Sequence, residues 1–240
     1  MNTIRINLWS GPRNVSTALM YSFAQRDDTS VFDEPFYAHY LHTTYANHPG
    51  KEEIINSMES DAAVVIKKII LGNFNKPVLL FKQMVHHLVD VDESFISKTE
   101  NVFLIRDPEE ILSSYLKVIT NPQMSDIGIK KQFELYNKLE GEGKVSCVVD
   151  AKELLLNPQK ILSQACEKIK IPFTEKMLSW KAGARIEDGV WAKYWYGSVH
   201  KSTGFKKYEQ QNIILPAHLK PLADECQTYY QYLYDKALKH

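Results

Sequence analysis

Eight residues near the N-terminus, SGPRNVST at positions 10–17, combine groups that bind a phosphate-like anion. A short apolar run at positions 4–9 precedes them, and apolar residues follow at helical spacing: Leu19, Met20 and Phe23. This pattern predicts a buried strand that turns directly into a helix. Backbone N–H groups converge in such a turn, and the helix adds unpaired N–H groups and the positive end of its dipole. The string is therefore a candidate anion-binding loop.

The side chains of this loop suit the same role. Gly11 lets the backbone approach a ligand closely, Arg13 offers a forked cation, and Ser16 and Thr17 add hydroxyl donors. The alternative is a purely structural turn, because Gly-Pro pairs mark turns and Ser or Thr caps helices. The ATP-type loop G-x-x-x-x-G-K-[ST] is not matched, because Ser16 replaces its second Gly and Thr17 its Lys. An ATPase is disfavoured.

Two acids, Asp33 and Glu34, follow the next apolar run and precede Pro35. Aromatic neighbours can partly desolvate a carboxyl there, which raises its pKa towards that of a useful base. A carboxylate of this pair is therefore a candidate base, with His39 as the nearby alternative, and Asp33 could serve only to cap or orient. The competing interpretation is that both acids cap a following helix.

Lys82 follows a third apolar run, with His86 and His87 four and five positions later. On a helix that begins near Met84 the two imidazoles face different sides, so at most one reaches a common site. Adjacent histidines do not converge on a metal ion. Lys82 is the functional candidate, and each histidine fits a structural role.

Arg106 follows a fourth apolar run, in the string NVFLIRDPEEILSSY. Asp107 and Glu110 have the spacing of a capping box and Pro108 suits a first helical position, so a helix should begin at Pro108. Ser114 stands eight residues after Arg106. Both could bind an anion; alternatively, Arg106 pairs with a neighbouring carboxylate and Ser114 is an ordinary surface residue.

A turn-rich stretch at positions 189–208 carries aromatic residues together with Lys201, Ser202 and Gly204. Purines stack on aromatic rings and phosphates need cations, so the stretch suits a loop that closes over a nucleotide. A solvated lysine cluster beside a surface aromatic patch is the alternative.

The elements that must position these residues alternate along the chain. Apolar runs predict strands at 4–8, 29–32, 78–81, 101–105 and 144–149. Helical patterns occupy 16–25, 51–71, 86–91, 108–119, 127–139, two stretches around the Asn157-Pro158 break, and 215–238. This order predicts a three-layer α/β fold, with a central parallel sheet of about five strands covered by helices on both faces. Ligands of such sheets bind at the carboxyl ends of the strands, where the candidate residues stand.

The loop PRNVST resembles the 5′-phosphosulfate loop of the P-loop sulfotransferases, which use 3′-phosphoadenosine 5′-phosphosulfate (PAPS). Arg13 stands in the basic position and Ser16 and Thr17 in the hydroxyl positions, while Asn14 and Val15 replace the usual Ser/Gly pair. The resemblance implies a nucleotide-kinase-like fold and phosphosulfate contacts from the whole loop, comprising Ser10, Gly11, Pro12, Arg13, Asn14, Val15, Ser16 and Thr17.

The resemblance also implies roles elsewhere. Arg106 and Ser114 have the spacing of the residues that hold the 3′-phosphate, and Lys201, Ser202 and Gly204 correspond to a late basic loop, although HKSTGFKK departs from its usual R-K-G form. Glu34 matches the acid beside proline and aromatics that is the proposed base of bacterial sugar sulfotransferases. Lys82 matches the lysine that stabilises the bridging oxygen; the histidines follow it at four and five positions rather than two.

Composition limits the other possibilities. The 240 residues are 44% hydrophobic, enough for one α/β domain over positions 1–240. Lys+Arg and Asp+Glu both total 29, so no basic excess indicates a nucleic-acid partner. Cys147, Cys166 and Cys226 are isolated, without zinc or disulfide spacing. With neither a leader nor a membrane-length apolar run, the chain is expected in the cytoplasm.

These observations predict a PAPS-dependent sulfotransferase that moves a sulfuryl group in line onto a hydroxyl of a small alcohol or carbohydrate. Arg13, Ser16 and Thr17 would neutralise the donor, Lys82 would stabilise the bridging oxygen, and Glu34 would take the proton. No metal is expected, because a sulfuryl group carries less charge than a phosphoryl group. The alternatives are a P-loop kinase or other phosphoryl transferase, and a non-catalytic nucleotide-binding protein. Nothing in the sequence determines the oligomeric state.

Overall fold

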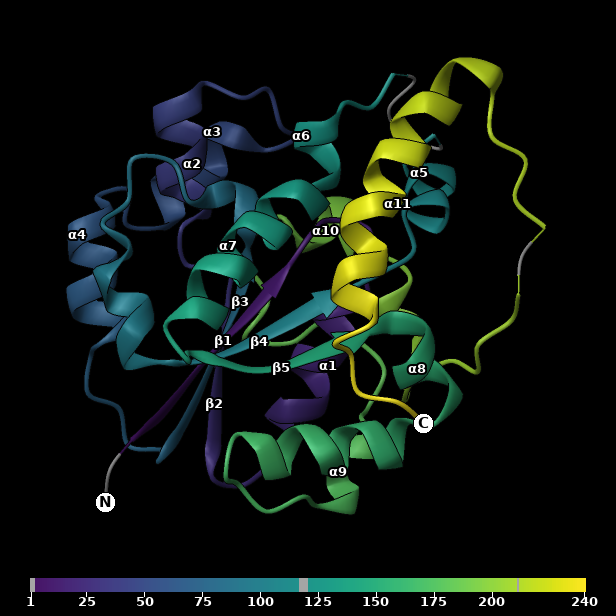
Figure 1. Cartoon of the computed structure of the whole chain (residues 1–240). Coiled ribbons are helices and arrows are strands. Elements are labelled where there is room, and N and C mark those ends of the chain that lie inside the picture. The colour runs from purple at the N-terminus through teal and green to yellow at the C-terminus, as the bar shows by residue number, and fades with distance from the viewer. Residues whose placement is uncertain (1–2, 117–120, 211) are drawn as a thin grey trace.

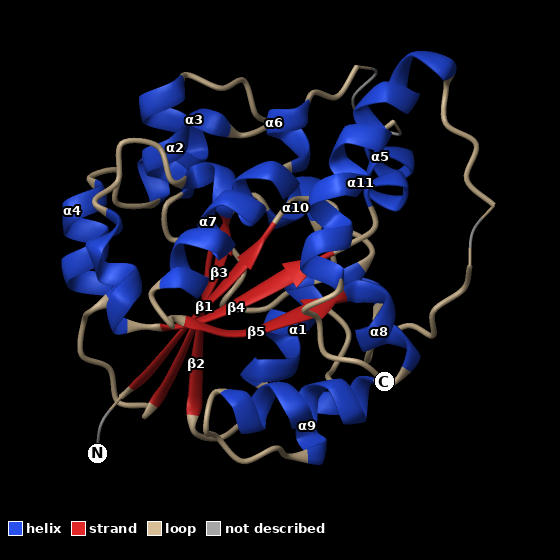
Figure 2. Ribbon diagram, viewed as in Figure 1, coloured by secondary structure: helices blue, strands red, loops and turns tan. Residues whose placement is uncertain are grey.

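The computed structural model describes residues 3–116, 121–210 and 212–240. Its centre is a sheet of five parallel strands in the order β2-β3-β1-β4-β5. The strands are β1 (Ile4–Ser10), β2 (Thr29–Asp33), β3 (Val78–Met84), β4 (Glu100–Ile105) and β5 (Val145–Asp150). Figure 2 shows their arrows pointing the same way. All five predicted strands are confirmed, each within three residues of its predicted ends.

Helices cover both faces of this sheet (Figure 1). On one face, β1 residues such as Ile6 and Leu8 pack with α1 (Ser16–Ala24) and α9 (Pro158–Lys168). Trp9 points to the other face, where α7 (Ile129–Gly141) and α11 (Lys220–Tyr234) contribute to the core. Side chains alternate along a strand, so one strand supplies apolar residues to both layers. The predicted three-layer α/β architecture is confirmed.

A third apolar cluster joins segments that are distant in the sequence. It contains residues of α2 (Tyr37–Thr44), of α3 (Lys51–Ser57) and of the stretch around α10 (Ala192–Trp195). The remaining α-helices are α4 (Ala62–Val65), α5 (Pro108–Tyr115), α6 (Met124–Ile127) and α8 (Ala151–Leu156). Because α2 directly follows Asp33 and Glu34, this cluster packs beside one of the predicted site segments.

Two predicted helices are broken. The single helix expected at 51–71 is interrupted after α3, where Met58 is extended and the Asp61 side chain accepts hydrogen bonds from the N–H groups of Ala63 and Val64 to start α4. A π-helical turn, Ile66–Ile70, follows α4. The helix expected at 127–139 is divided by Gly128, whose φ of 76° ends α6 and precedes α7. Local caps override the apolar periodicity in both cases.

Three further boundaries differ from the predictions. The helix expected at 86–91 is one 3-10 turn, Val85–His87, because β3 continues to Met84. Helix α5 begins at Pro108 as predicted and ends at Tyr115; the predicted continuation over 117–119 lies outside the described residues. The terminal helix is shorter than 215–238. Helix α2 was expected only in the competing interpretation of Asp33 and Glu34, and neither acid caps it, because it begins after Phe36 without a side-chain cap.

The topology places two of the predicted motifs next to each other. Strand β1 lies between β3 and β4, and the chain leaves β1 towards β2 at one edge but leaves β4 towards β5 at the other. Neighbouring strands whose connections diverge form a crevice at their carboxyl ends, where ligands of such sheets bind. The loop after β1 and the Arg106 segment after β4 both open onto this crevice.

Candidate active site

The loop between β1 and α1 has the backbone geometry expected of an anion site. We call residues 10–17 the anion loop. A Cβ atom on Gly11 would lie 2.5 Å from the carbonyl oxygen of Ile127, so only glycine fits there. Arg13 adopts a φ of 55°, which is unusual for a residue other than glycine and is found at ligand-binding turns. Helix α1 starts without a side-chain cap. The loop N–H groups of Gly11, Arg13, Asn14, Ser16, Thr17 and Ala18 have no acceptor among the described residues.

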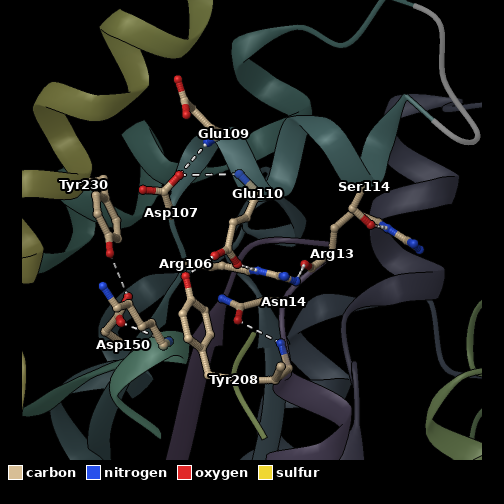
Figure 3. A network of polar contacts seen from close by, with 12 residues as sticks. Arg13, Asn14, Arg106, Asp107, Glu109, Glu110, Ser114, Asp150, Tyr208 and Tyr230 are labelled. Carbon is tan, nitrogen blue, oxygen red and sulfur yellow. Dashed lines mark hydrogen bonds and ion pairs between the residues drawn. The ribbon is translucent and has the colours of Figure 1, made fainter. Parts of the chain in front are cut away.

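The loop is fastened to β4 and α5, as Figure 3 shows. Arg106 donates from Nη1 to the main-chain oxygen of Arg13 at 2.8 Å, and Arg13 donates from Nε to Ser114 Oγ at 3.0 Å. Asn14 donates from Nδ2 to the oxygen of Leu104 at 3.0 Å. The two predicted anion motifs, the β1–α1 loop and the Arg106–Ser114 pair, are therefore in direct contact. Arg13 contacts both residues of the second motif.

Gln132, on α7, is hydrogen-bonded to the two strands that flank this loop. Its Nε2 donates to the carbonyl oxygens of Trp9 and Leu104, at 3.1 and 3.0 Å. The Ser10 hydroxyl donates to the carbonyl oxygen of Gly11 and is fully buried, so it stabilises the turn rather than facing a ligand. The carboxyl ends of β1 and β4 are thus held together by side-chain amides.

Arg106 is oriented by an acid that the sequence identified only as a capping residue. Its Nε donates to Glu110 Oε2 at 2.8 Å, and the Tyr208 hydroxyl donates to Glu110 Oε1 at 2.9 Å (Figure 3). Asp107 caps α5 as predicted, but Glu110 does not complete the capping box. The predicted alternative, Arg106 paired with a nearby carboxylate, is present together with its contact to the loop. Within the described residues Arg106 Nη2 has no acceptor, so it can still face an anion.

Ser202 and Gly204 have structural roles within the protein. Ser202 accepts a hydrogen bond from Trp180 Nε1 at 3.0 Å and donates to the oxygen of Val199. Gly204 pairs with Ser179 as an isolated antiparallel bridge, and Lys201 is exposed. The part of this stretch that reaches the Arg106 network is Tyr208, which the sequence interpretation missed. The signal was the pair Lys206-Lys207 before this tyrosine, at the end of the 189–208 stretch, whereas the interpretation singled out Lys201, Ser202 and Gly204.

A second group of polar residues lies at the ends of β2 and β3, where Asp33 pairs in register with Lys82. Lys82 Nζ donates to Asp33 Oδ1 at 2.8 Å, to Glu34 Oε1 at 2.6 Å and to the Tyr196 hydroxyl at 2.8 Å. Tyr196 in turn donates to Asp33 Oδ2 at 2.6 Å. The Lys82 side chain is 1% exposed. We call these four residues the carboxylate–lysine cluster.

Burial and charge act against each other in this cluster. Burial opposes the charge of Lys82, but Asp33 and Glu34 outweigh it and hold the Lys82 pKa well above its usual range. Burial and the neighbouring Asp33 raise the pKa of Glu34, and Lys82 only partly offsets them. Glu34 therefore has the raised basicity that was expected of a general base. Its φ of 45° is a further sign of a constrained functional position.

Burial raises the pKa of Tyr115, on α5, which is also affected by charged groups from both parts of the site. These groups are Arg13 and Glu34. The Tyr115 hydroxyl donates to the carbonyl oxygen of Asp126 at 3.0 Å.

Of the three candidate histidines, His87 is the one beside Glu34. Its Nε2 lies 4.0 Å from Glu34 Oε2, and its ring stacks on Tyr37 and Tyr40 with centroid distances of 4.8 and 4.7 Å. Burial lowers the pKa of His87 well below its usual value and that of His86 to about 3. Both rings are therefore neutral at physiological pH.

His39 is held elsewhere. Its two ring nitrogens lie 3.0 Å from the oxygen of Ser60 and 2.8 Å from that of Val89. It lines a surface cavity of about 670 Å³, whose lining residues include none from the anion loop or the carboxylate–lysine cluster. Because both ring nitrogens are paired and its cavity is separate from the candidate site, His39 does not fit the role of base.

In the described part of the chain, no group of three or more His, Cys, Asp or Glu side chains is arranged to hold a metal ion. None of the helices described is long and apolar enough to cross a bilayer.

The chain is similar to two proteins of Arabidopsis thaliana. It is 37% identical over 229 residues to branched-chain-amino-acid aminotransferase-like protein 2, covering 95% of this chain and 41% of that protein. It is 42% identical over 207 residues to branched-chain-amino-acid aminotransferase-like protein 1, covering 85% and 37%. The chain thus spans about two fifths of the length of these relatives.

Solved structures share the fold at low identity. The sulfotransferase domain from the curacin biosynthetic pathway has a TM-score of 0.60 and 16% identity, with 98% of this chain and 99% of that chain covered. The sulfotransferase domain from the Synechococcus PCC 7002 olefin synthase has a TM-score of 0.59 and 15% identity, covering 97% and 96%. The sulfotransferase from Alicyclobacillus acidocaldarius has a TM-score of 0.56 and 9% identity, covering 99% and 98%.

The model of one protein family, described as the sulfotransferase domain, matches residues 4–219. That range contains all five strands, the anion loop, Arg106 and the carboxylate–lysine cluster. The chain therefore belongs to the sulfotransferase domain family.

Proposed function

We propose that this chain transfers a sulfuryl group from PAPS to a hydroxyl of a small alcohol or carbohydrate, and that residues 1–240 act as one domain. The observation that carries the proposal is the contact between Arg106 Nη1 and the Arg13 main chain. It brings a 5′-phosphosulfate loop and a 3′-phosphate motif together, as one nucleotide bearing both groups requires. The neighbouring carboxylate–lysine cluster supplies a base.

The proposed donor site uses the groups that lack partners inside the protein. The unpaired N–H groups of the loop and the hydroxyls of Ser16 and Thr17 face the phosphosulfate, and Arg13 adds a positive charge. Arg106 Nη2 and Ser114 take the 3′-phosphate, with Tyr208 and the exposed Lys206 and Lys207 beside them. These contacts bind the developing charge of the leaving nucleotide, which is how positioning and electrostatics supply most of the rate.

In the proposed transfer, the acceptor oxygen attacks the sulfur and the bond from sulfur to the bridging phosphate oxygen breaks. The acceptor proton passes to Glu34 Oε2, and adenosine 3′,5′-bisphosphate leaves with the electron pair. Glu34 suits this role because its Oε1 is held by Lys82 while its side chain keeps 8% of its surface exposed. A base within hydrogen-bond reach of the proton is the geometric requirement.

Lys82 takes a different part from the one expected from the sequence. Its three ammonium protons are all donated inside the carboxylate–lysine cluster, so none is free for the bridging oxygen. We propose that Lys82 holds Glu34 in place and keeps it ionised. Arg13 then remains the cation closest to the donor.

The acceptor would enter beside the aromatic rings that surround Glu34. Tyr37, Tyr40 and His87 stack there, and the Tyr37 hydroxyl is hydrogen-bonded to His48 Nδ1 at 2.8 Å. Flat rings with polar edges suit the alternating apolar and hydroxyl surfaces of a sugar or small alcohol.

A kinase is the less favoured candidate, because Thr17 occupies the position of the lysine that ATP-type loops require. A non-catalytic nucleotide-binding protein would not need a buried Glu34 beside Lys82, because burying such a pair is costly.

Calorimetric titration with adenosine 3′,5′-bisphosphate, and with magnesium-ADP in parallel, is the decisive binding test. We expect binding of the bisphosphate without magnesium and at least tenfold weaker binding of ADP. A screen of alcohols and sugars with radiolabelled PAPS then identifies the acceptor. Preference for magnesium-ADP would indicate a kinase, and bisphosphate binding without transfer to any acceptor would indicate a non-catalytic protein.

A further inference from the structure

Tyr196 is joined to the carboxylate–lysine cluster although it lies 114 residues beyond Lys82 in the sequence. Its hydroxyl accepts from Lys82 Nζ at 2.8 Å and from Trp191 Nε1 at 3.2 Å, and donates to Asp33 Oδ2 at 2.6 Å. A phenol has one donor and two acceptor sites, so all three are used. An almost fully buried hydroxyl with every site occupied is part of a specific network rather than filler.

The hydrogen bonds within the cluster leave one carboxylate oxygen without a donor. Lys82 gives one proton each to Asp33, Glu34 and Tyr196. Asp33 Oδ2 is taken by Tyr196, with the N–H of Gly189 at 3.4 Å. Of the four carboxylate oxygens of the cluster, only Glu34 Oε2 has no hydrogen-bond donor among the described residues, and His87 Nε2 lies 4.0 Å from it. That oxygen is the one to which the proposed mechanism assigns the proton.

We propose that Tyr196 and Asp33 are positioning residues that hold Lys82 so that it donates to Glu34 through Oε1 alone and leaves Oε2 for the acceptor. The inference rests on the proposed function and adds two residues that do not touch the substrate. Without Tyr196, one ammonium proton and Asp33 Oδ2 each lose a partner, and Lys82 can turn towards the second oxygen of Glu34.

The same contact joins the cluster to the stretch that carries Tyr196. Residues 188–196 are attached at several points: Asp188 accepts from the Tyr21 hydroxyl of α1 at 2.6 Å, and Trp191 packs edge-on against Tyr37 of α2. The stretch is therefore fixed to α1 and α2 as well as to the carboxylate–lysine cluster.

The first test compares Tyr196→Phe with Tyr194→Phe, a half-exposed tyrosine of the same stretch that lies outside the cluster. Tyr196→Phe should lower kcat by at least about tenfold, the scale on which misplaced general bases lose activity. The acceptor KM and the affinity for adenosine 3′,5′-bisphosphate should stay within about twofold of wild type. Tyr194→Phe should leave all three constants unchanged. Equal kcat values for the two variants would overturn the role of Tyr196.

The second test uses the charge of Asp33. The titratable groups facing Glu34 come from several elements: Asp33, Lys82, His87, Tyr37, Tyr115 and Tyr196. Asp33→Asn removes a like charge, so the pKa of Glu34 should fall and the acidic limb of the kcat/KM profile should move to lower pH by about one unit. A variant that merely loosens the fold would lower the melting temperature and leave the limb in place, which would overturn the role of Asp33.

Carbon-13 NMR of selectively labelled glutamate carboxyls gives a readout without turnover. The Glu34 signal, identified by its absence in Glu34→Gln, should titrate at lower pH in Asp33→Asn than in wild type. If wild type fails to bind adenosine 3′,5′-bisphosphate, the proposed function is wrong, while this shift would still support the link between Asp33 and Glu34. If wild type binds and turns over but neither variant differs from it, only the positioning inference is wrong.

Discussion

Glu34 concentrates the opposing requirements of the site in a single side chain. Burial favours its neutral form, whereas Lys82 favours its ionised form, and a base must be ionised and still attract a proton. Glu34→Gln keeps the shape and the hydrogen bond from Lys82 but cannot accept a proton. We expect kcat to fall by about 10²- to 10⁴-fold, with adenosine 3′,5′-bisphosphate binding within about twofold of wild type. Calorimetry and a radiolabel transfer assay measure the two quantities; matched losses in both would make Glu34 structural.

Under the proposed function, Arg106 selects nucleotides that carry a 3′-phosphate. Its Nη2 is free among the described residues, whereas Nε is held by Glu110 and Nη1 by the Arg13 carbonyl. Arg106→Ala should weaken adenosine 3′,5′-bisphosphate by about 10- to 100-fold, because a hydrogen bond to a charged group contributes roughly 1.5–3 kcal/mol. Adenosine 5′-phosphate, which lacks the 3′-phosphate, should lose less than about threefold. An equal loss for both nucleotides, measured by calorimetry, would mean that Arg106 only supports the loop.

At the scale of elements, the sequence was most informative where a local rule determines geometry. Asp107 and Pro108 specify the start of α5 through a side-chain cap and a fixed φ, and the structure has both. Apolar runs identified all five strands, because a parallel sheet buries both faces of each strand. The residues directly after the strands were therefore predictable as site candidates.

The parts that were not predictable depend on contacts between distant segments. Tyr196 and Tyr208 belong to a stretch without strong periodicity, and their partners Lys82 and Glu110 lie 114 and 98 residues away. Composition near Tyr208 indicated a basic loop but not which residue would meet Arg106. Helix breaks were missed for the opposite reason, because strong periodicity at 51–71 concealed the cap at Asp61.

The anion loop itself provides an element-scale prediction. A methyl group on Gly11 would meet the Ile127 carbonyl oxygen at 2.5 Å, so the loop or α6 must move. Gly11→Ala should lower the free energy of unfolding by about 1–3 kcal/mol, as overpacking does, and should abolish nucleotide binding because the N–H groups no longer converge. Urea unfolding and calorimetry measure these effects.

Gly141→Ala is the matched control for that substitution. Gly141 lies in the last turn of α7, and a Cβ there meets nothing within 4 Å. Replacing a helical glycine by alanine should stabilise the protein by up to about 1 kcal/mol and leave nucleotide binding unchanged. If Gly11→Ala behaves in the same way as Gly141→Ala, the close approach to Ile127 is not a constraint on the loop.

In the whole molecule, the carboxyl end of the sheet carries both the candidate site and buried ionisable side chains. Asp150 at the end of β5 shares this edge but has a structural task. It accepts hydrogen bonds from the N–H groups of Lys152 and Glu153, which starts α8, and from the Tyr230 hydroxyl of α11 at 3.0 Å (Figure 3). It thereby attaches the C-terminal helix to the sheet.

Burial raises the pKa of Asp150 from 3.8 to about 6, in spite of these hydrogen bonds. A carboxyl with a raised folded-state pKa binds its proton more tightly in the native state, so its contribution to stability is fully present below pH 4 and is lost as the pH rises through about 6. The shift of roughly two units corresponds to about 3 kcal/mol. Asp150→Asn retains a capping side chain and removes the titration. We therefore expect Asp150→Asn to become more stable relative to wild type as the pH rises from 4 to 7, as measured by the free energy of urea unfolding at each pH. Parallel curves for the two proteins would show that Asp150 titrates alike in the folded and unfolded chains, and that the α8–α11 junction is not where the fold carries its buried charge.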